Sequence, residues 1–126
     1  TWCTGPVTLA AHTIPTITRA AEEFGRPAPR VIAALPVCVT ADRDAAAARA
    51  AETFAAYGGL PSYRAMLDRE GVAGPADIAI IGTTAEVQDR IGALAGIGVT
   101  DFAAVEFGET PEEVADTRSA LKGLLS

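Results

Sequence analysis

The sequence predicts an α/β fold in the form of a partial βα barrel. Residues 31–39 and 99–107 are continuous apolar runs, which is typical of parallel strands buried on both faces. The segments around these runs carry helical periodicity, and helical crossovers of this length join parallel strands in a right-handed sense. The length of 126 residues suits one domain. We therefore expect one α/β unit without internal repeats or linkers.

The first helix is expected to begin at Thr4, Gly5 and Pro6, because they offer a capping residue and a proline suited to the first turn. Apolar residues then recur at steps of three and four, which describes one face of a helix of about five turns. These residues are Val7, Ala10, Ile14, Ile17, Ala21 and Phe24. Gly25 ends the pattern, and Pro15 within it is expected to kink the helix.

The first predicted strand, residues 31–39, contains a proline. Pro36 cannot donate to a ladder of hydrogen bonds, so we expect a bulge or a local irregularity there. An alanine-rich helix follows the strand and extends to about Tyr57, where two glycines break it. Pro61 then starts a shorter helix that ends near Gly71.

The second half of the chain has two capping boxes. Residues 78–82 are compatible with a short strand, a helix or a loop, and Thr83 with Glu86 fits the first box. The strand at residues 99–107 is followed by the second box, from Thr110 to Glu113. The apolar faces of the two capped helices are Val87, Ile91 and Leu94 in the first and Val114, Leu121 and Leu125 in the second.

The two clear strands raise a problem of burial. Both are apolar on both faces, yet two strands cannot cover each other from both sides, and an isolated pair is marginally stable. We therefore expect their missing neighbours to lie in another chain or in sequence that precedes Thr1. A partial barrel satisfies this requirement better than a complete sheet.

Composition excludes several classes of function. The net charge is -6, and Lys122 is the only lysine, which argues against binding to nucleic acids or to anionic membranes. No apolar run is long enough to span a membrane. Cys3 and Cys38 form neither a disulfide framework nor a zinc motif. No signal or transit peptide is recognisable at the start, so we expect a cytoplasmic protein.

Two long segments carry a resemblance to a known family. Residues 1–40, TWCTGPVTLAAHTIPTITRAAEEFGRPAPRVIAALPVCVT, resemble the late-barrel region of the luciferase-like monooxygenase superfamily. Residues 57–108, YGGLPSYRAMLDREGVAGPADIAIIGTTAEVQDRIGALAGIGVTDFAAVEFG, continue the likeness. The likeness follows the running sequence and involves no single catalytic motif. It is greatest to the oxidoreductases that use the deazaflavin coenzyme F-420.

This resemblance implies the C-terminal part, about the last three βα units, of a bacterial-luciferase-like (β/α)8 TIM barrel. Residues 1–3 would close strand six, residues 31–39 would be strand seven, and residues 99–107 would be strand eight. The cofactor would lie across the C-terminal ends of the strands, where barrel active sites are found. The implied reaction is hydride transfer between coenzyme F-420 and a small organic substrate, and the alternative is an FMN-dependent monooxygenase of the same superfamily.

Site residues follow from the same resemblance. Residues that line the pocket near the cofactor are expected at the end of strand six. Residues that contact substrate are expected at the end of strand eight and in a helical insertion that this family has between strands seven and eight. The first set is Trp2, Cys3, Thr4 and Gly5, and the second is Tyr63, Phe107 and Gly108. The catalytic acid–base residues would lie in the preceding strands, so none is assigned in this chain.

Structural roles compete with each of these assignments. Trp2 suits ring stacking or an anchor in the barrel rim. Thr4 and Gly5 suit anion binding at a helix start or, more simply, N-capping. Tyr63 suits control of substrate access or packing between helices. His12 lies in mid-helix without a recognisable partner, which favours a surface or packing role.

A different class of function also remains open. A non-enzymatic βα module that completes its sheet by oligomerising would show the same strands, since the chain carries no catalytic dyad: Asp101 and Glu106, five residues apart, fall on opposite strand faces. The expected partners are therefore further copies of the chain or the N-terminal part of the barrel. We expect the 126-residue chain alone to be inactive.

Overall fold

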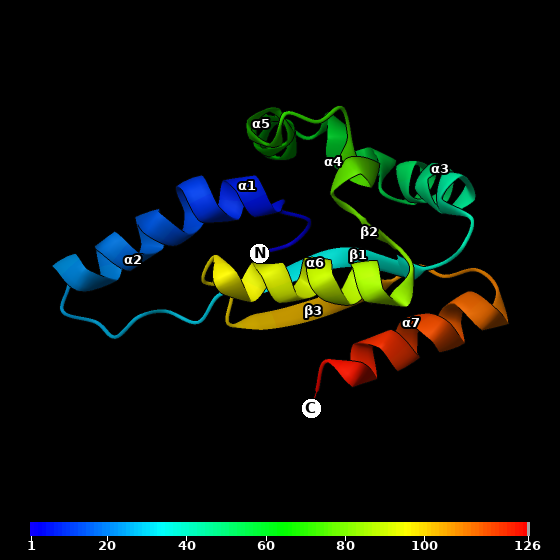
Figure 1. The fold of residues 1–126 in the computed structure, drawn as a ribbon. Coiled ribbons are helices and arrows are strands. Elements are labelled where there is room, and N and C mark those ends of the chain that lie inside the picture. Colours follow the sequence, from blue (N-terminus) through cyan, green and yellow to red (C-terminus); the bar gives the residue numbers. More distant parts are fainter. Residues whose placement is uncertain (126) are drawn as a thin grey trace.

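The computed structural model describes residues 1–125. Three of its segments form a parallel sheet with the strand order β2-β1-β3, and helices surround this sheet (Figure 1). The central strand is β1 (Ile32–Val39), flanked by β2 (Ile80–Gly82) and β3 (Asp101–Glu106). Both pairings are parallel, which confirms the predicted arrangement of the two apolar runs. Residues 78–82, which the sequence left open, divide between a 3-10 turn and strand β2.

The helices form groups around this sheet (Figure 1). α6 and α7 run beside the strands, whereas α3, α4 and α5 gather away from α7. The elements are α1 (Pro6–Thr8), the π-helix η1 (Leu9–Thr13), α2 (Ile14–Glu23), α3 (Arg43–Thr53), α4 (Ala55–Gly59), α5 (Pro61–Glu70), the 3-10 helix η2 (Pro75–Ile78), α6 (Thr84–Gly96) and α7 (Pro111–Gly123).

The first helical segment contains a wide turn before its proline. The amide of Ile14 donates to the carbonyl of Leu9, five residues earlier, and this is the hydrogen-bond pattern of a π-helix. Pro15 follows directly, at the start of α2. A proline in a helix interior loses one amide donor and crowds the preceding turn, and an irregular turn next to it is a usual outcome. The sequence predicts a kink at Pro15, and the structure has a π-helix in the turn directly before it.

The predicted apolar face of this helix is only partly correct. Ile14 and Ile17 pack against the main core. Val7 is 50% exposed and Phe24 is 79% exposed. Thr8 and Leu9, next to Val7, are buried instead, so the buried side of this segment differs from the predicted face at its start.

β1 is covered on both faces by its own chain. Leu35 and Val37 belong to the main core beneath the helices, together with Val87 of α6. On the other face, Phe54 lies in a second cluster with Val105 of β3. The expectation that this chain lacks cover for both strands is therefore wrong for β1. The break between α3 and α4 places Phe54 in this second cluster. Sequence periodicity describes one helix at a time and does not predict such a contact between distant segments.

β3 differs from β1 in its exposure. None of its residues is fully buried, and no strand within the described residues 1–125 pairs with its outer edge. The expectation of a missing neighbour thus agrees with the exposure of β3.

Pro36 does not produce the expected bulge. The register between β1 and β3 continues without interruption from Ile32 to Val37. The amide and carbonyl of Ala34 bond to residues 1 and 3, so the nitrogen of Pro36, two residues on, faces the same side. That side is vacant there, because β2 begins opposite Val37. The proline occupies a position in β1 where no partner strand requires an amide donor.

The predicted capping boxes at the starts of two helices are present in the structure. Thr83 with Glu86 and Thr110 with Glu113 form the two predicted capping boxes. The alanine-rich helix ends earlier than predicted, because the chain leaves helical geometry at Phe54.

The core faces of the last two helices differ in how well they were predicted. Val87, Ile91 and Leu94 are buried in α6, as expected. In α7 the buried residues are Thr117 and Ala120, whereas Leu125 lies beyond the helix and is 86% exposed. The prediction of Leu125 as a core residue is therefore wrong.

Candidate functional site

An aromatic row connects the N-terminal segment with the end of β3. We define this row as Trp2, Tyr57, Phe54 and Phe107, with Tyr63 packed on Tyr57. The ring centroids are 6.2 Å apart for Trp2 and Tyr57, and 6.5 Å apart for Tyr57 and Phe54. Phe54 and Phe107 meet edge to face at 6.0 Å, and Tyr57 and Tyr63 at 4.9 Å. These separations are within the range of favourable ring contacts.

The elements that carry the rings explain the order of the row. Trp2 is fixed by a parallel bridge to Ala34 of β1, and its side chain is 41% exposed. Phe54 is buried where α3 gives way to α4. Tyr57 and Phe107 are partly buried beside it. The row therefore has a buried centre and an accessible end at Trp2.

Three of the residues expected in the site share this row. Trp2, Tyr63 and Phe107 come from distant parts of the sequence, and Tyr57 and Phe54 connect them. Sequence reasoning noted Tyr57 beside the glycine turn but missed Phe54. The available signal was spacing, since Phe54 follows the buried Ala46 and Ala50 at steps of four.

Cys3 is a buried thiol in an unusual backbone conformation. Its φ is 48°, the left-handed region that non-glycine residues rarely adopt. Burial raises the pKa of its thiol to about 11. The thiol is therefore protonated near neutral pH and is a poor nucleophile.

The start of the first helix is not capped by Thr4. The hydroxyl of Thr4 donates to the carbonyl of Trp2 instead, and the N-cap residue is Gly5. The carboxylate of Glu70 in α5 accepts hydrogen bonds from the amides of Val7 (3.3 Å) and Thr8 (2.6 Å). The interpretation of Thr4 as a capping side chain is wrong, because a carboxylate distant in sequence satisfies these donors. An anionic ligand at this helix start would have to displace Glu70.

Gly5 is closely packed against the same carboxylate. A Cβ atom added to Gly5 would lie 2.3 Å from Cδ of Glu70. Thr4 and Gly5 thus contact Trp2 and Glu70, and neither belongs to the aromatic row.

A polar cluster centred on Arg49 of α3 lies at the end of β3. Its Nε donates to the carbonyl of Phe107 at 3.1 Å, and its Nη1 and Nη2 donate to Glu109 at 3.1 Å and Glu113 at 2.8 Å. Nη2 also lies 3.7 Å from Sγ of Cys38. The guanidinium carbon is 5.8 Å from the centroid of the Phe107 ring, which suits a cation–π contact. Sequence reasoning missed Arg49, whose partners lie far along the chain.

Glu113 is the strongly ionised member of this cluster. The amide of Glu109 lowers the pKa of the Glu113 carboxyl the most, and Thr40, Thr110 and Arg49 lower it further, to about 2. Partial burial acts in the opposite direction. Arg49 and Glu113 thus form a half-buried ion pair, with side chains 20% and 13% exposed. The positive charge of Arg49 is already balanced by carboxylates.

The surroundings of Cys38 and Gly108 indicate packing roles. Burial raises the pKa of the Cys38 thiol, with a further contribution from nearby Glu113, which supports the interpretation of Cys38 as a packing residue. A Cβ atom on Gly108 would lie 3.1 Å from Cβ of Glu113, so Gly108 permits close approach of the chain to α7. His12 is exposed.

Each of the two carboxylates of β3 forms an ion pair with a different arginine. Asp101 pairs with Arg30, and Glu106 pairs with Arg118 at 2.9 Å. They form no acid–base pair, as expected from their odd spacing. Within residues 1–125, no group of three potential metal-ligating side chains comes together. No helix in that part of the chain has the length and apolarity to cross a membrane.

Comparison with known proteins identifies the family. The family model described as luciferase-like monooxygenase matches residues 1–124. No curated protein and no solved structure matches the chain. The parallel α/β sheet agrees with the family match, and the family is one of oxidoreductases. The chain therefore belongs to the luciferase-like monooxygenase family.

Proposed function

We propose that this chain is the C-terminal portion of a (β/α)8-barrel oxidoreductase that transfers a hydride between coenzyme F-420 and a small organic substrate. The observation that carries the proposal is the aromatic row, which presents a partly accessible indole and phenol rings beside the parallel sheet. Together with the family match, this supports a site for a planar heterocycle.

The residues of the row fit the ring of such a cofactor. Trp2 and Tyr57 offer aromatic surface, and the buried Phe54 holds Tyr57 from behind. Neither Arg49 nor the start of the first helix suits the phosphate of the cofactor, because carboxylates balance Arg49 and Glu70 occupies that helix start. Groups that hold the phosphate, and the acid–base residues, would belong to the preceding strands of the barrel.

The bound deazaflavin would itself accept or donate the hydride. The chain's own residues would bind the ring, orient it and exclude water from one of its faces. Phe54 is buried, and a β-bridge fixes the backbone of Trp2. Both limit the movement of the aromatic row and so support such positioning.

An FMN-dependent monooxygenase is the second candidate, favoured by the description of the family. The aromatic row suits either ring. An oligomerising βα module is the alternative outside enzymes, favoured by the open edge of β3.

Cofactor titration tests these proposals. Trp2 is the only tryptophan, so its fluorescence reports ligands that approach the row. We expect coenzyme F-420 to quench Trp2 emission at lower concentration than FMN does. Trp2→Ala, followed through the fluorescence of the deazaflavin, should weaken binding about tenfold. The control Phe24→Ala removes an exposed ring outside the row and should leave binding unchanged.

The outcomes separate the candidates. Tight binding of FMN without a response to the deazaflavin would replace the first proposal with the second. Binding of neither cofactor by the chain and by a longer polypeptide that includes the preceding strands would leave only the non-enzymatic module. Hydride transfer by the 126-residue chain alone, at rates like those of a full barrel, would contradict the assignment of the acid–base residues to preceding sequence.

A further inference from the structure

The side chain of Arg49 lies where three elements meet: α3, the end of β3 and the start of α7. Its Nε donates to the carbonyl of Phe107 at 3.1 Å, while Nη1 and Nη2 donate to the carboxylates of Glu109 and Glu113 at 3.1 Å and 2.8 Å. All three nitrogens of the guanidinium therefore have an acceptor, and the side chain is 20% exposed. A planar fork that is held at three points has little freedom to turn.

The bond from Arg49 to Phe107 takes the place of a hydrogen bond of the sheet. The amide of Phe107 donates to the carbonyl of Val37 at 3.3 Å, as in a parallel pair. If this ladder continued, the carbonyl of Phe107 would accept from the amide of Val39. That amide donates instead to the hydroxyl of Thr117 at 2.9 Å. The ladder ends here, and Arg49 supplies the donor that the next pair of the ladder would have supplied.

The ring of Phe107 is held from the same helix as its carbonyl. The guanidinium carbon of Arg49 lies 5.8 Å from the centroid of this ring. Phe54, at the end of α3, meets the ring edge to face at 6.0 Å. Phe54 also packs on Tyr57, whose ring centroid is 6.5 Å away. A shift of the Phe107 backbone would therefore move its ring against Phe54, and the disturbance would reach Tyr57.

The carboxylates around Arg49 fix its guanidinium and balance its charge. Glu113 accepts hydrogen bonds from the amides of Glu109 at 2.8 Å and Thr110 at 3.4 Å, so the start of α7 sets its position. Chiefly the amide of Glu109 lowers the pKa of the Glu113 carboxyl to about 2, and the group is ionised at neutral pH. Arg49 is thus a fixed donor toward Phe107 and offers no free charge to an anion.

We propose that Arg49 is a positioning residue of the proposed cofactor site and acts through Phe107. It holds the carbonyl and the ring of Phe107, so that Phe54 keeps Tyr57 in the orientation that supports the cofactor ring. This inference rests on the proposed function, in which the rings of Trp2 and Tyr57 offer the aromatic surface.

Charge balance alone is the competing explanation for Arg49. In that case any cation beside Glu113 would suffice, because only the charge of a half-buried carboxylate has to be neutralised. The proposed role requires the fork, since one group must reach Phe107 and Glu113 at the same time. Lysine carries its charge on a single nitrogen, so Arg49→Lys keeps a cation but loses the separate Nε donor. This variant distinguishes the two explanations.

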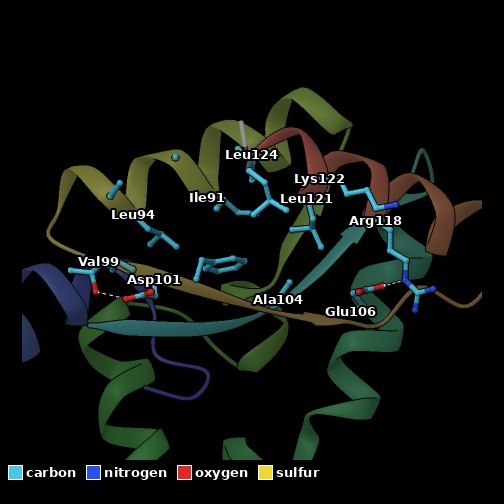
Figure 2. Close-up of a pocket in the computed structure, with 15 residues that line it drawn as sticks. Ile91, Leu94, Val99, Asp101, Ala104, Glu106, Arg118, Leu121, Lys122 and Leu124 are labelled. Atoms are coloured by element: carbon cyan, nitrogen blue, oxygen red, sulfur yellow. Dashed lines mark hydrogen bonds and ion pairs between the residues drawn. The ribbon is translucent and has the colours of Figure 1, made fainter. Parts of the chain in front are cut away.

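NMR of the chain without cofactor tests the hold on Phe107. In the wild type, the ring protons of Phe107 and Phe54 should give a strong nuclear Overhauser effect, because the rings meet edge to face. Arg49→Lys should remove most of this signal. Arg118→Lys is the matched control and should preserve it. Figure 2 shows Arg118 of α7 paired with Glu106 of β3, at 2.9 Å and on the face of the strand opposite the aromatic row.

A double-mutant cycle tests whether Arg49 acts through Phe107. In the titration with coenzyme F-420, Arg49→Lys and Phe107→Leu should each weaken binding about fivefold, a loss typical of one aromatic contact. The double variant should also lose about fivefold, because the second change removes nothing that the first has left in place. Independent effects would multiply to about 25-fold. Arg118→Lys should bind as the wild type does.

An unchanged ring signal between Phe54 and Phe107 in Arg49→Lys, or a double variant that binds about 25-fold more weakly, would overturn the inference. Phe107→Leu retains the ion pairs of Arg49 and gives a decision even where Arg49→Lys does not fold. Weaker binding by Phe107→Leu supports the inference, and binding equal to that of the wild type refutes it. The proposed function fails separately, when the wild type binds no coenzyme F-420 although Arg49→Lys loses the ring signal.

Discussion

The hydroxyl of Thr117 in α7 accepts a hydrogen bond of 2.9 Å from the amide of Val39 at the end of β1. Both residues are buried, and the bond joins the last helix to the central strand across 78 positions of sequence. Val39 lies beyond the last β1 residue that pairs with β3, so a side chain satisfies its amide.

Thr117→Val should lower the free energy of unfolding by about 1–3 kcal/mol, because it leaves the buried amide of Val39 without an acceptor while keeping the side-chain shape. Urea denaturation measures this difference. Thr117→Ser retains the hydroxyl and should recover much of the loss. Equal stability of the valine variant and the wild type would show that the bond contributes nothing.

The Glu113 carboxyl should make stability depend on pH in the acid range. Its pKa is lowered from 4.5 to about 2 in the folded chain, so its stabilising contribution is complete above about pH 4.5. The contribution is lost as the pH falls through the folded pKa. Glu113→Gln should therefore be less stable than the wild type at pH 7, by on the order of 2 kcal/mol, and the difference should shrink towards pH 2.

Thermal denaturation between pH 7 and pH 2 measures the effect of Glu113. The neighbouring exposed Glu112 supplies the control, since Glu112→Gln changes a carboxylate of the same turn and should leave stability at pH 7 close to that of the wild type. A difference for Glu113→Gln that does not vary with pH would contradict the assignment.

Gly5 should tolerate no side chain without loss of the Glu70 contact. In Gly5→Ala the new Cβ would overlap the Glu70 carboxylate, which must move away from the amides of Val7 and Thr8. We expect a loss of about 1–3 kcal/mol, since the bonds involve a charged acceptor. Gly59→Ala is the matched control, because nothing lies within 4 Å of a Cβ there. Equal stability of both variants in urea denaturation would refute the importance of this contact.

The thiols of Cys3 and Cys38 should resist modification in the folded chain. Both are free and buried, and the pKa of Cys3 is raised to about 11. Ellman's reagent at pH 8 should react with neither until the chain opens, and with both in denaturant. Ser119→Cys, on the exposed surface of α7, should react at once and serves as the positive control. Immediate reaction of the wild type would show that the thiols are accessible.

Features set by nearby residues were predictable from the sequence. Thr83 and Glu86 satisfy each other within one turn, so spacing alone identifies the cap. The long apolar run of β1 likewise identifies a buried strand. β2 could not be assigned, because three residues are too short for a pattern and its pairing partner lies about forty positions earlier in β1.

The site was predictable only in part. The resemblance indicated Trp2, Tyr63 and Phe107, and the structure brings them into one row. Arg49 could not be found in the same way, because its carbonyl and carboxylate partners lie 58 to 64 positions away. Contacts over such distances depend on how helices fold over the sheet, which local periodicity does not encode.

The π-helix at Leu9–Thr13 holds one more residue than a regular α-helical path would need. Its wide turn absorbs that residue, so α2 continues in nearly the same phase, and Ile14 and Ile17 reach the core. An α-helix advances by about 100° per residue. An added residue that was not absorbed in this way would turn Ile14 and Ile17 away from the core. The irregular turn is thus the place where this segment takes up a change in length without turning its apolar side outwards.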